Sequence, residues 1–159
     1  MIQSIKIREG ITFMENIKIV MGPACAGKSY FIKENFPTAT VIDLYDYQKT
    51  RPYLNSEGIM ESYEECKNAL VEAIKENKEE IVLEHTLLKA KRRKVYIDAI
   101  REVTDKPIII YVVLPSREIL KKFSKLRGVN YDDLDIDLIL DVLEIPTKEE
   151  GFASVIMVD

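Results

Sequence analysis

The sequence predicts one three-layer α/β domain, with a mostly parallel sheet of about five strands and helices on both faces. Three observations support this fold class. Short apolar runs typical of buried strands alternate with longer segments whose apolar residues have helical spacing. The chain of 159 residues is 47% hydrophobic and has no Pro/Gly/Ser-rich linker, which fits a single domain. The pattern G-x-x-x-x-G-K-S stands between the first strand and the first helix of this series.

That pattern, residues 22–29, predicts a phosphate-binding loop (P-loop), because the apolar run 17–21 precedes it and a helix follows that ends before Pro37. Its two glycines let backbone N–H groups approach phosphate oxygens at the positive end of that helix. Lys28 is expected to reach the β- and γ-phosphates, and Ser29 to ligate Mg²⁺. The residues expected to contact the nucleotide are Gly22, Pro23, Ala24, Cys25, Ala26, Gly27, Lys28, Ser29 and Tyr30.

The remaining elements follow from apolar spacing along the chain. Strands are expected at 40–42, 81–83, 107–114 and 152–158, and helices at 56–77, 88–104, 116–126 and 131–143, the first of these helices capped by Ser56. Ile119, Leu120, Phe123 and Leu126 share one helix face, and Leu138, Ile139, Val142 and Leu143 are expected to point inward from the next helix. Residues 1–13 are either an added edge strand or an extension of a domain spanning 14–159.

Polar residues follow two of the expected strands. Ligands bind outside the carboxyl ends of the strands in an open parallel sheet, so Asp43 and Asp46 are candidates for meeting a substrate hydroxyl. Asp also caps turns readily, and we expect one of the two to be catalytic and the other structural. Glu84, His85 and Thr86 follow the next strand; Glu84 is expected to hold magnesium through a water or to contact substrate. A lone histidine is more often a neutral, hydrogen-bonded side chain than a catalyst.

Basic residues cluster in two further places. Arg92 and Arg93 are either a solvated helix face or approach the cleft and hold an anionic part of the substrate. Lys122, Lys125 and Arg127 are expected to form a lid that neutralises charge at the γ-phosphate.

Composition bounds the remaining options. A formal charge of −4 argues weakly against a broad nucleic-acid footprint, without excluding a local basic patch. The two cysteines form neither a disulfide framework nor a metal-binding spacing. No apolar run is long enough for a membrane span or signal peptide, so a cytoplasmic protein without a membrane partner is expected.

Several segments together resemble the polynucleotide 5′-hydroxyl kinases and the related zeta-toxin kinases: the P-loop, 41–47, 86–93, 123–128 and 145–152. The resemblance covers nearly the whole chain after Met14, and it implies a P-loop kinase fold, a general base at Asp46 or Asp43, and lid cations at Lys122, Lys125 and Arg127. The chain departs from the family pattern at two positions. Tyr45 stands at the base position, and His85 replaces an aspartate that precedes the threonine matched by Thr86.

The function expected from these residues is transfer of the γ-phosphoryl of ATP, with Mg²⁺, to a hydroxyl of an acceptor. The acceptor is left open as a polynucleotide 5′ end, a nucleotide sugar or another small metabolite. The alternative is a nucleotide-binding regulatory module or a slow NTPase that has no phosphoryl acceptor, and the substituted Tyr45 and His85 keep that alternative open.

Overall fold

The computed structural model describes residues 16–51 and 54–158. The expected edge strand or extension at residues 1–13 lies outside this part of the chain, as does the start of the expected 14–159 domain.

A parallel five-stranded sheet forms the centre of the described chain, in the order β2-β3-β1-β4-β5. The strands are β1 (Ile17–Met21), β2 (Thr40–Asp43), β3 (Ile81–His85), β4 (Ile108–Val113) and β5 (Ser154–Val158). β1, β3 and β4 are buried throughout, since each has a strand on both sides and helices on both faces. The expected fold class is therefore confirmed.

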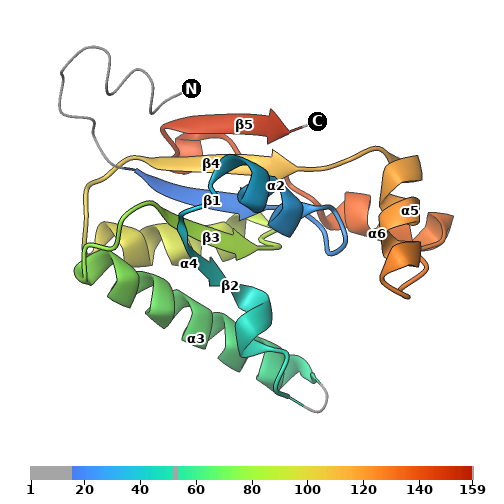
Figure 1. Cartoon of the computed structure of the whole chain (residues 1–159), viewed down its shortest axis with the longest axis horizontal. Helices are drawn as coiled ribbons and strands as arrows, with labels where there is room; N and C mark the ends of the chain where they lie inside the picture. Colours follow the sequence, from blue (N-terminus) through green and yellow to red (C-terminus); the bar gives the residue numbers. More distant parts are fainter. Residues whose placement is uncertain (1–15, 52–53, 159) are drawn as a thin grey trace.

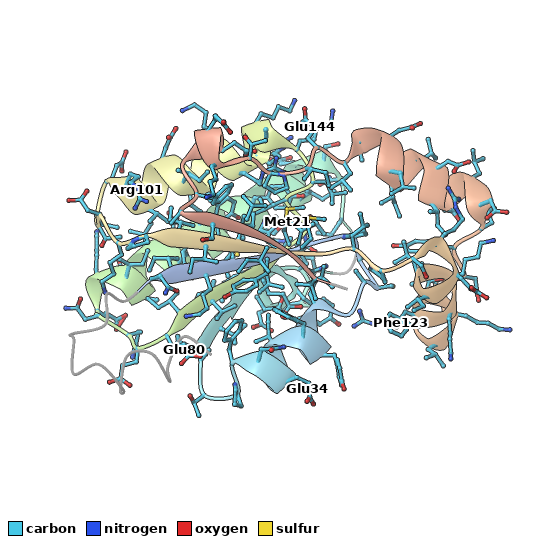
Figure 2. All side chains as sticks on the ribbon, turned by 90° about the horizontal axis from the view of Figure 1, so that it is seen from above. Met21, Glu34, Glu80, Arg101, Phe123 and Glu144 are labelled. Atoms are coloured by element: carbon cyan, nitrogen blue, oxygen red, sulfur yellow. The ribbon has the colours of Figure 1, made fainter. Side chains whose placement is uncertain are left out.

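The helices occupy both faces of the sheet, as expected (Figure 1). They are α2 (Lys28–Asn35), α3 (Ser56–Lys75), α4 (Ala90–Arg101), α5 (Arg117–Leu126) and α6 (Asp133–Val142), with the 3-10 turns η1 (Leu44–Tyr47) and η2 (Lys148–Glu150). Figure 2 shows α2 on one side of the sheet and α4 on the other. α5 and α6 lie beyond the carboxyl ends of the strands (Figure 1).

Successive side chains of a strand point to opposite faces of the sheet, so the hydrophobic core forms two clusters. Ile17, Ile19 and Met21 of β1 pack in the cluster under α3 and α4, whereas Val20 packs in the cluster on the α2 face. On the α2 face, Lys18 is buried with its ammonium 5.2 Å from the centroid of the Phe36 ring. Cys66 of α3 is fully buried in the first cluster, where it packs as a small hydrophobic side chain.

Three local expectations were wrong. β2 is partly exposed rather than buried, because it is the edge strand of the sheet. Asn55 caps α3 in place of Ser56, accepting a 2.8 Å hydrogen bond from the N–H of Gly58. In α6, Leu138 and Val142 are exposed, and Ile136 is the buried residue. Ile136 belongs to the same buried cluster as Leu120 of α5.

A buried ion pair fixes the loop that follows β3. Arg93 is fully buried, and its guanidinium donates to both carboxylate oxygens of Glu150 at 2.8 and 3.1 Å and to the carbonyl of Leu87 at 2.9 Å. Glu144 adds a second link, since its N–H donates to the carbonyl of Leu88 at 2.8 Å. These contacts hold Leu87 in a left-handed backbone conformation, at φ 44°. The segment before β5 therefore fixes the exit of β3, where the polar strand end lies.

None of the helices among residues 16–51 and 54–158 combines the length and apolarity that a bilayer crossing needs.

Candidate active site

The P-loop turns tightly against β4. A Cβ atom on Gly22 would lie 2.2 Å from the carbonyl oxygen of Val113, so only glycine fits there. Gly27 has a left-handed backbone at φ 97° and caps α2, and a Cβ atom on it would lie 3.4 Å from the ring of Phe123. The loop is therefore shaped as a cradle with the N-terminus of α2 at its base, which suits a polyphosphate.

Lys28 begins α2 and turns back over the loop. Its ammonium donates to the carbonyl oxygens of Gly22 and Pro23 at 2.9 and 2.8 Å. Burial lowers the pKa of Lys28 to about 8, and the carboxylates of Glu84 and Asp43 oppose this shift by favouring the charged form. A half-buried ammonium next to a backbone cradle is a strong partner for a phosphate anion.

Ser29 and Glu84 join the P-loop to the end of β3. The Ser29 hydroxyl donates a 2.6 Å hydrogen bond to Oε2 of Glu84. Burial raises the pKa of Glu84, and the bond from Ser29 acts against this shift. The described residues contain no cluster of three or more potential metal-binding side chains. Mg²⁺ does not need one at a phosphate site, because it commonly binds one or two protein oxygens, water and phosphate oxygens. Ser29 and Glu84 fit that donor set.

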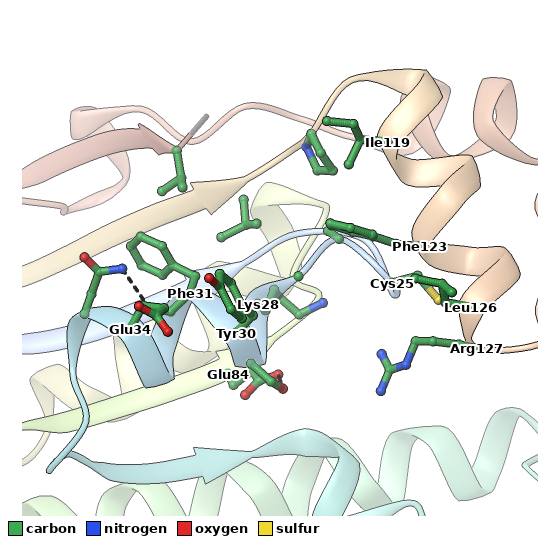
Figure 3. A pocket seen from close by; sticks show the side chains of 17 residues that line it. Cys25, Lys28, Tyr30, Phe31, Glu34, Glu84, Ile119, Phe123, Leu126 and Arg127 are labelled. Atoms are coloured by element: carbon green, nitrogen blue, oxygen red, sulfur yellow. Dashed lines mark hydrogen bonds between the residues drawn. The ribbon is translucent and has the colours of Figure 1, made fainter.

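Two cavities meet at this loop (Figure 3 shows the larger). The larger has a volume of about 690 Å³ and lies between α2 and α5. The smaller, of about 190 Å³, lies between the P-loop, η1 and the end of β3. Their lining has five residues in common: Cys25, Lys28, Ser29, Glu84 and Arg127. The two cavities therefore adjoin at these five residues, of which Lys28, Glu84 and Arg127 are charged; we call the five the wall that the cavities share.

The larger cavity has a mostly apolar lining. Tyr30 and Phe31 of α2 face Ile119, Phe123 and Leu126 of α5 across it (Figure 3). Tyr30, Ile119 and Leu126 are exposed by 70%, 43% and 78%. The shared face of α5 therefore divides: Leu120 is buried in the core, while Ile119, Phe123 and Leu126 border this open space. Its size and lining suit the base and ribose of a nucleotide whose phosphates lie on the P-loop.

Only one of the two candidate bases lies at the smaller cavity. Asp43 lines it, while Asp46 does not; the Asp46 carboxylate is exposed and paired with Lys49 at 3.0 Å. Asp43 is also the cap of η1, since its Oδ1 accepts from the N–H of Tyr45 at 3.0 Å. Burial raises the pKa of Asp43, with the Tyr45 N–H opposing the shift. A carboxyl with a raised pKa that faces a cavity is a candidate general base.

His85 also lines the smaller cavity, and it is a neutral side chain there. It is only 2% exposed, and burial lowers its pKa to about 3. One ring nitrogen, Nε2, is 3.0 Å from the hydroxyl of Tyr96, which donates to the carbonyl of Tyr63 at 3.0 Å. The Tyr96 hydroxyl therefore accepts from His85, which leaves Nδ1 as an unprotonated acceptor without a hydrogen-bond partner. Thr86 borders the same cavity, and its carbonyl accepts from the N–H of Gly22 at 3.3 Å.

Of the three basic residues expected to form a lid, not all border the site. Arg127 lines both cavities and extends from the end of α5 into the space near Glu84 (Figure 3). Lys122 and Lys125 are exposed and line neither cavity, so Arg127 is the one lid cation of the three that borders the site.

Neither expectation for Arg93 was right, because this side chain is buried in the ion pair with Glu150 and reaches neither solvent nor substrate. Arg92 lies with its guanidinium carbon 5.9 Å from the centroid of the Tyr63 ring and donates to the sulfur of Met60. Neither arginine lines the smaller cavity.

Two contributions at the site were not predicted. Gln48 lines the smaller cavity, together with Tyr45, because the short turn η1 precedes it, and no apolar spacing marks such a turn. The hydroxyl of Tyr131 donates to the carbonyl of Ala24 at 3.3 Å, which ties the segment after α5 to the P-loop. This contact spans 107 residues and carries no local sequence signal.

No family profile matches this sequence, and no curated protein matches it either. Solved structures do match. A protein from Chloroflexus aurantiacus proposed to be a kinase is 11% identical with a TM-score of 0.70, over 92% of this chain and 85% of that one. The PezAT toxin–antitoxin system of Streptococcus pneumoniae gives 13% identity and a TM-score of 0.66, over 99% and 72% of the two chains. The Pnkp1/Rnl/Hen1 RNA repair complex gives 16% identity and a TM-score of 0.65, over 82% of this chain and 44% of that one. At such identities the likeness shows the fold alone, the α/β fold of P-loop kinases.

Proposed function

We propose that this chain, which has the fold of P-loop kinases, transfers the γ-phosphoryl group of ATP to a hydroxyl group of an acceptor. The observation that carries the proposal is the meeting of two cavities at one charged wall. A kinase needs a donor and an acceptor held on opposite sides of the phosphoryl group that moves. An NTPase without an acceptor has no need for the second cavity, with its carboxylate and neutral polar lining.

Different residues of the shared wall bind the phosphates, hold the magnesium ion and neutralise the transferred group. The loop amides and Lys28 bind the β- and γ-phosphates, and the Lys28 ammonium exchanges the carbonyls of Gly22 and Pro23 for phosphate oxygens. Ser29 and Glu84 would hold Mg²⁺, which when bound supplies charge neutralisation on the phosphate oxygens. Arg127 neutralises charge that develops on the transferred group, as an arginine finger does.

Asp43 orients the acceptor hydroxyl and takes its proton. In the reaction the acceptor oxygen forms a bond to the γ-phosphorus, the bond from that phosphorus to the β–γ bridging oxygen breaks, and ADP leaves. The proton passes from the acceptor oxygen to the free Oδ2 of Asp43, because Oδ1 is engaged by the N–H of Tyr45. Asp46 remains outside this scheme because its carboxylate pairs with Lys49 at the surface.

The experiment follows the label. The chain is incubated with Mg²⁺, ATP labelled on the γ-phosphate, and a mixture of sugars, nucleosides, nucleotide sugars and 5′-hydroxyl oligonucleotides. The proposal predicts label in an organic phosphate ester, and loss of that product in Lys28→Ala. Label that appears only as inorganic phosphate with every compound contradicts it.

A further inference from the structure

Resting on the proposed function, we propose further that the acceptor group entering the smaller cavity is a small, uncharged polyhydroxyl unit of the size of a sugar ring, and not an anionic compound. The smaller cavity has a volume of about 190 Å³. Pockets for drug-sized ligands span about 300–1,000 Å³. The space beside Asp43 and His85 therefore suits one ring with its hydroxyls.

The charges of the cavity disfavour an anion. Among the residues that the structure describes, its lining has two cations, Lys28 and Arg127. Both also border the larger cavity, where the phosphates of the nucleotide would neutralise them. The other charged lining residues are the carboxylates Asp43 and Glu84. With Glu84 assigned to Mg²⁺, the carboxylate of Asp43 remains on the acceptor side, and an anionic acceptor would enter beside it with no cation of its own, which costs binding energy unless the anion is paired.

The nearby arginines do not change this balance. Arg93 is fully buried and both of its hydrogen-bonding edges are engaged by Glu150 and the carbonyl of Leu87. Arg92 packs over the ring of Tyr63 and lies outside the lining. Neither arginine at the start of α4 is therefore placed to form a bidentate pair of hydrogen bonds with a carboxylate or phosphate in this cavity.

The neutral groups of the cavity fit hydroxyls. His85 borders the cavity, but its Nε2 is paired with the hydroxyl of Tyr96 and its Nδ1 is buried, so neither ring nitrogen is open to an anion. The side-chain amide of Gln48 donates to the hydroxyl of Ser62 at 3.1 Å, which leaves its carbonyl oxygen as an acceptor. Thr86 and Tyr45 add hydroxyl groups to the same lining. Such a set of acceptors and hydroxyls recognises a compound rich in O–H donors.

The test compares acceptors in pairs matched in size and different in charge. The probes are glucose and gluconate, galactose and galactonate, and ribose and ribonate, each with γ-labelled ATP and Mg²⁺, and the readout is label in the phosphate ester. We expect at least one uncharged member to accept label, and its anionic partner to accept at about one-tenth of that rate or less, the discrimination expected of one unpaired charge.

A charge variant checks the cause. Tyr45 is 63% exposed, so Tyr45→Arg adds a cation at the rim of the cavity with little risk to folding. It is expected to raise the rate of the anionic partner relative to the uncharged one by about fivefold or more. The control, Met157→Arg, adds the same charge on the edge strand β5, outside both cavities, and should leave the ratio unchanged.

The outcomes separate the two proposals. Label in an anionic compound but in no uncharged one, or an anionic partner that is the faster of its pair, overturns the acceptor class and leaves the kinase proposal standing. Label that stays in ATP or reaches only inorganic phosphate with all six probes overturns this acceptor class. The kinase proposal then falls as well if the wider mixture of acceptors also yields no labelled ester.

Discussion

Ser29 and Glu84, 55 positions apart in the sequence, are joined by a hydrogen bond of 2.6 Å from the serine hydroxyl to Oε2 of the carboxylate. The bond connects the first turn of α2 to the last part of β3. Its two residues belong to the wall that the two cavities share. Both candidate oxygen ligands for a magnesium ion therefore lie at the point where phosphoryl transfer is proposed.

Glu84→Gln tests this pair. The amide keeps a hydrogen-bond acceptor for Ser29 but loses the negative charge, so it should hold a divalent cation less well. We expect the transfer rate to fall by about 10²-fold and the Mg²⁺ concentration needed for half the maximal rate to rise. The control is Glu79→Gln, at an exposed position before the same strand. Equal rates and equal Mg²⁺ dependence for Glu84→Gln and wild type would remove Glu84 from the site.

Arg127→Ala tests the lid. Arg127 borders both cavities, whereas Lys122 and Lys125 are exposed and border neither. Removing a cation that stabilises transition-state charge should lower the transfer rate by about 10³-fold. Lys122→Ala and Lys125→Ala should have much smaller effects. A larger loss in either lysine variant than in Arg127→Ala, measured with the same labelled ATP, would reverse this assignment.

The pKa of Lys28 predicts how nucleotide binding depends on pH. Burial lowers this pKa to about 8, so the free protein loses the ammonium charge as the pH rises through that value. Between about pH 7 and about pH 9 the charged fraction falls by about tenfold, and the affinity for Mg-ATP should fall by a similar factor. Isothermal titration in buffers of different ionisation enthalpy should record proton uptake on binding near pH 8. Proton release at that pH would contradict a lysine that binds phosphate in its charged form.

The burial of His85 predicts a loss of stability in mild acid. Burial lowers its folded-state pKa to about 3 from the ordinary 6.5, so between these values the unfolded chain binds a proton that the folded chain does not. Stability from this residue therefore falls as the pH drops below 6.5. From about pH 7 to about pH 5.5 the loss is about 1 kcal/mol.

Urea unfolding of wild type and His85→Asn at both pH values measures that loss. Because His85 is the only histidine, the variant should lose less stability than wild type over this interval, and the difference isolates the residue. An equal change in both proteins would mean that folding does not lower the pKa of His85.

The sequence predicted the sheet, the P-loop and the elements that carry the polar strand ends, because these depend on local patterns. Apolar runs mark β1, β3 and β4, and the glycine and lysine spacing marks the loop. The choice between Asp43 and Asp46 needed the structure. The two residues are three positions apart, and only the turn η1 directs Asp43 toward the cavity and Asp46 toward Lys49.

The roles of α4 and α5 also required the fold. A basic run at the start of α4 is typical of a solvated face, yet Glu150, 57 positions away, turns Arg93 into a buried structural group. The apolar face of α5 has the spacing of a core helix, yet its Ile119 and Leu126 border the larger cavity. Spacing alone predicts that a face is apolar, and the packing partner decides whether it meets the core or a ligand.

Calorimetric titration with Mg-ATP of the wild-type chain and of Lys28→Ala tests the central claim most directly, that residues 22–29 bind the phosphates of a nucleotide. The account predicts saturable binding to the wild type and an affinity at least about tenfold weaker in the variant, since the alanine removes a charge-assisted partner of the phosphates. Equal affinity in both proteins, or no binding of either Mg-ATP or Mg-GTP to the wild type, would contradict it.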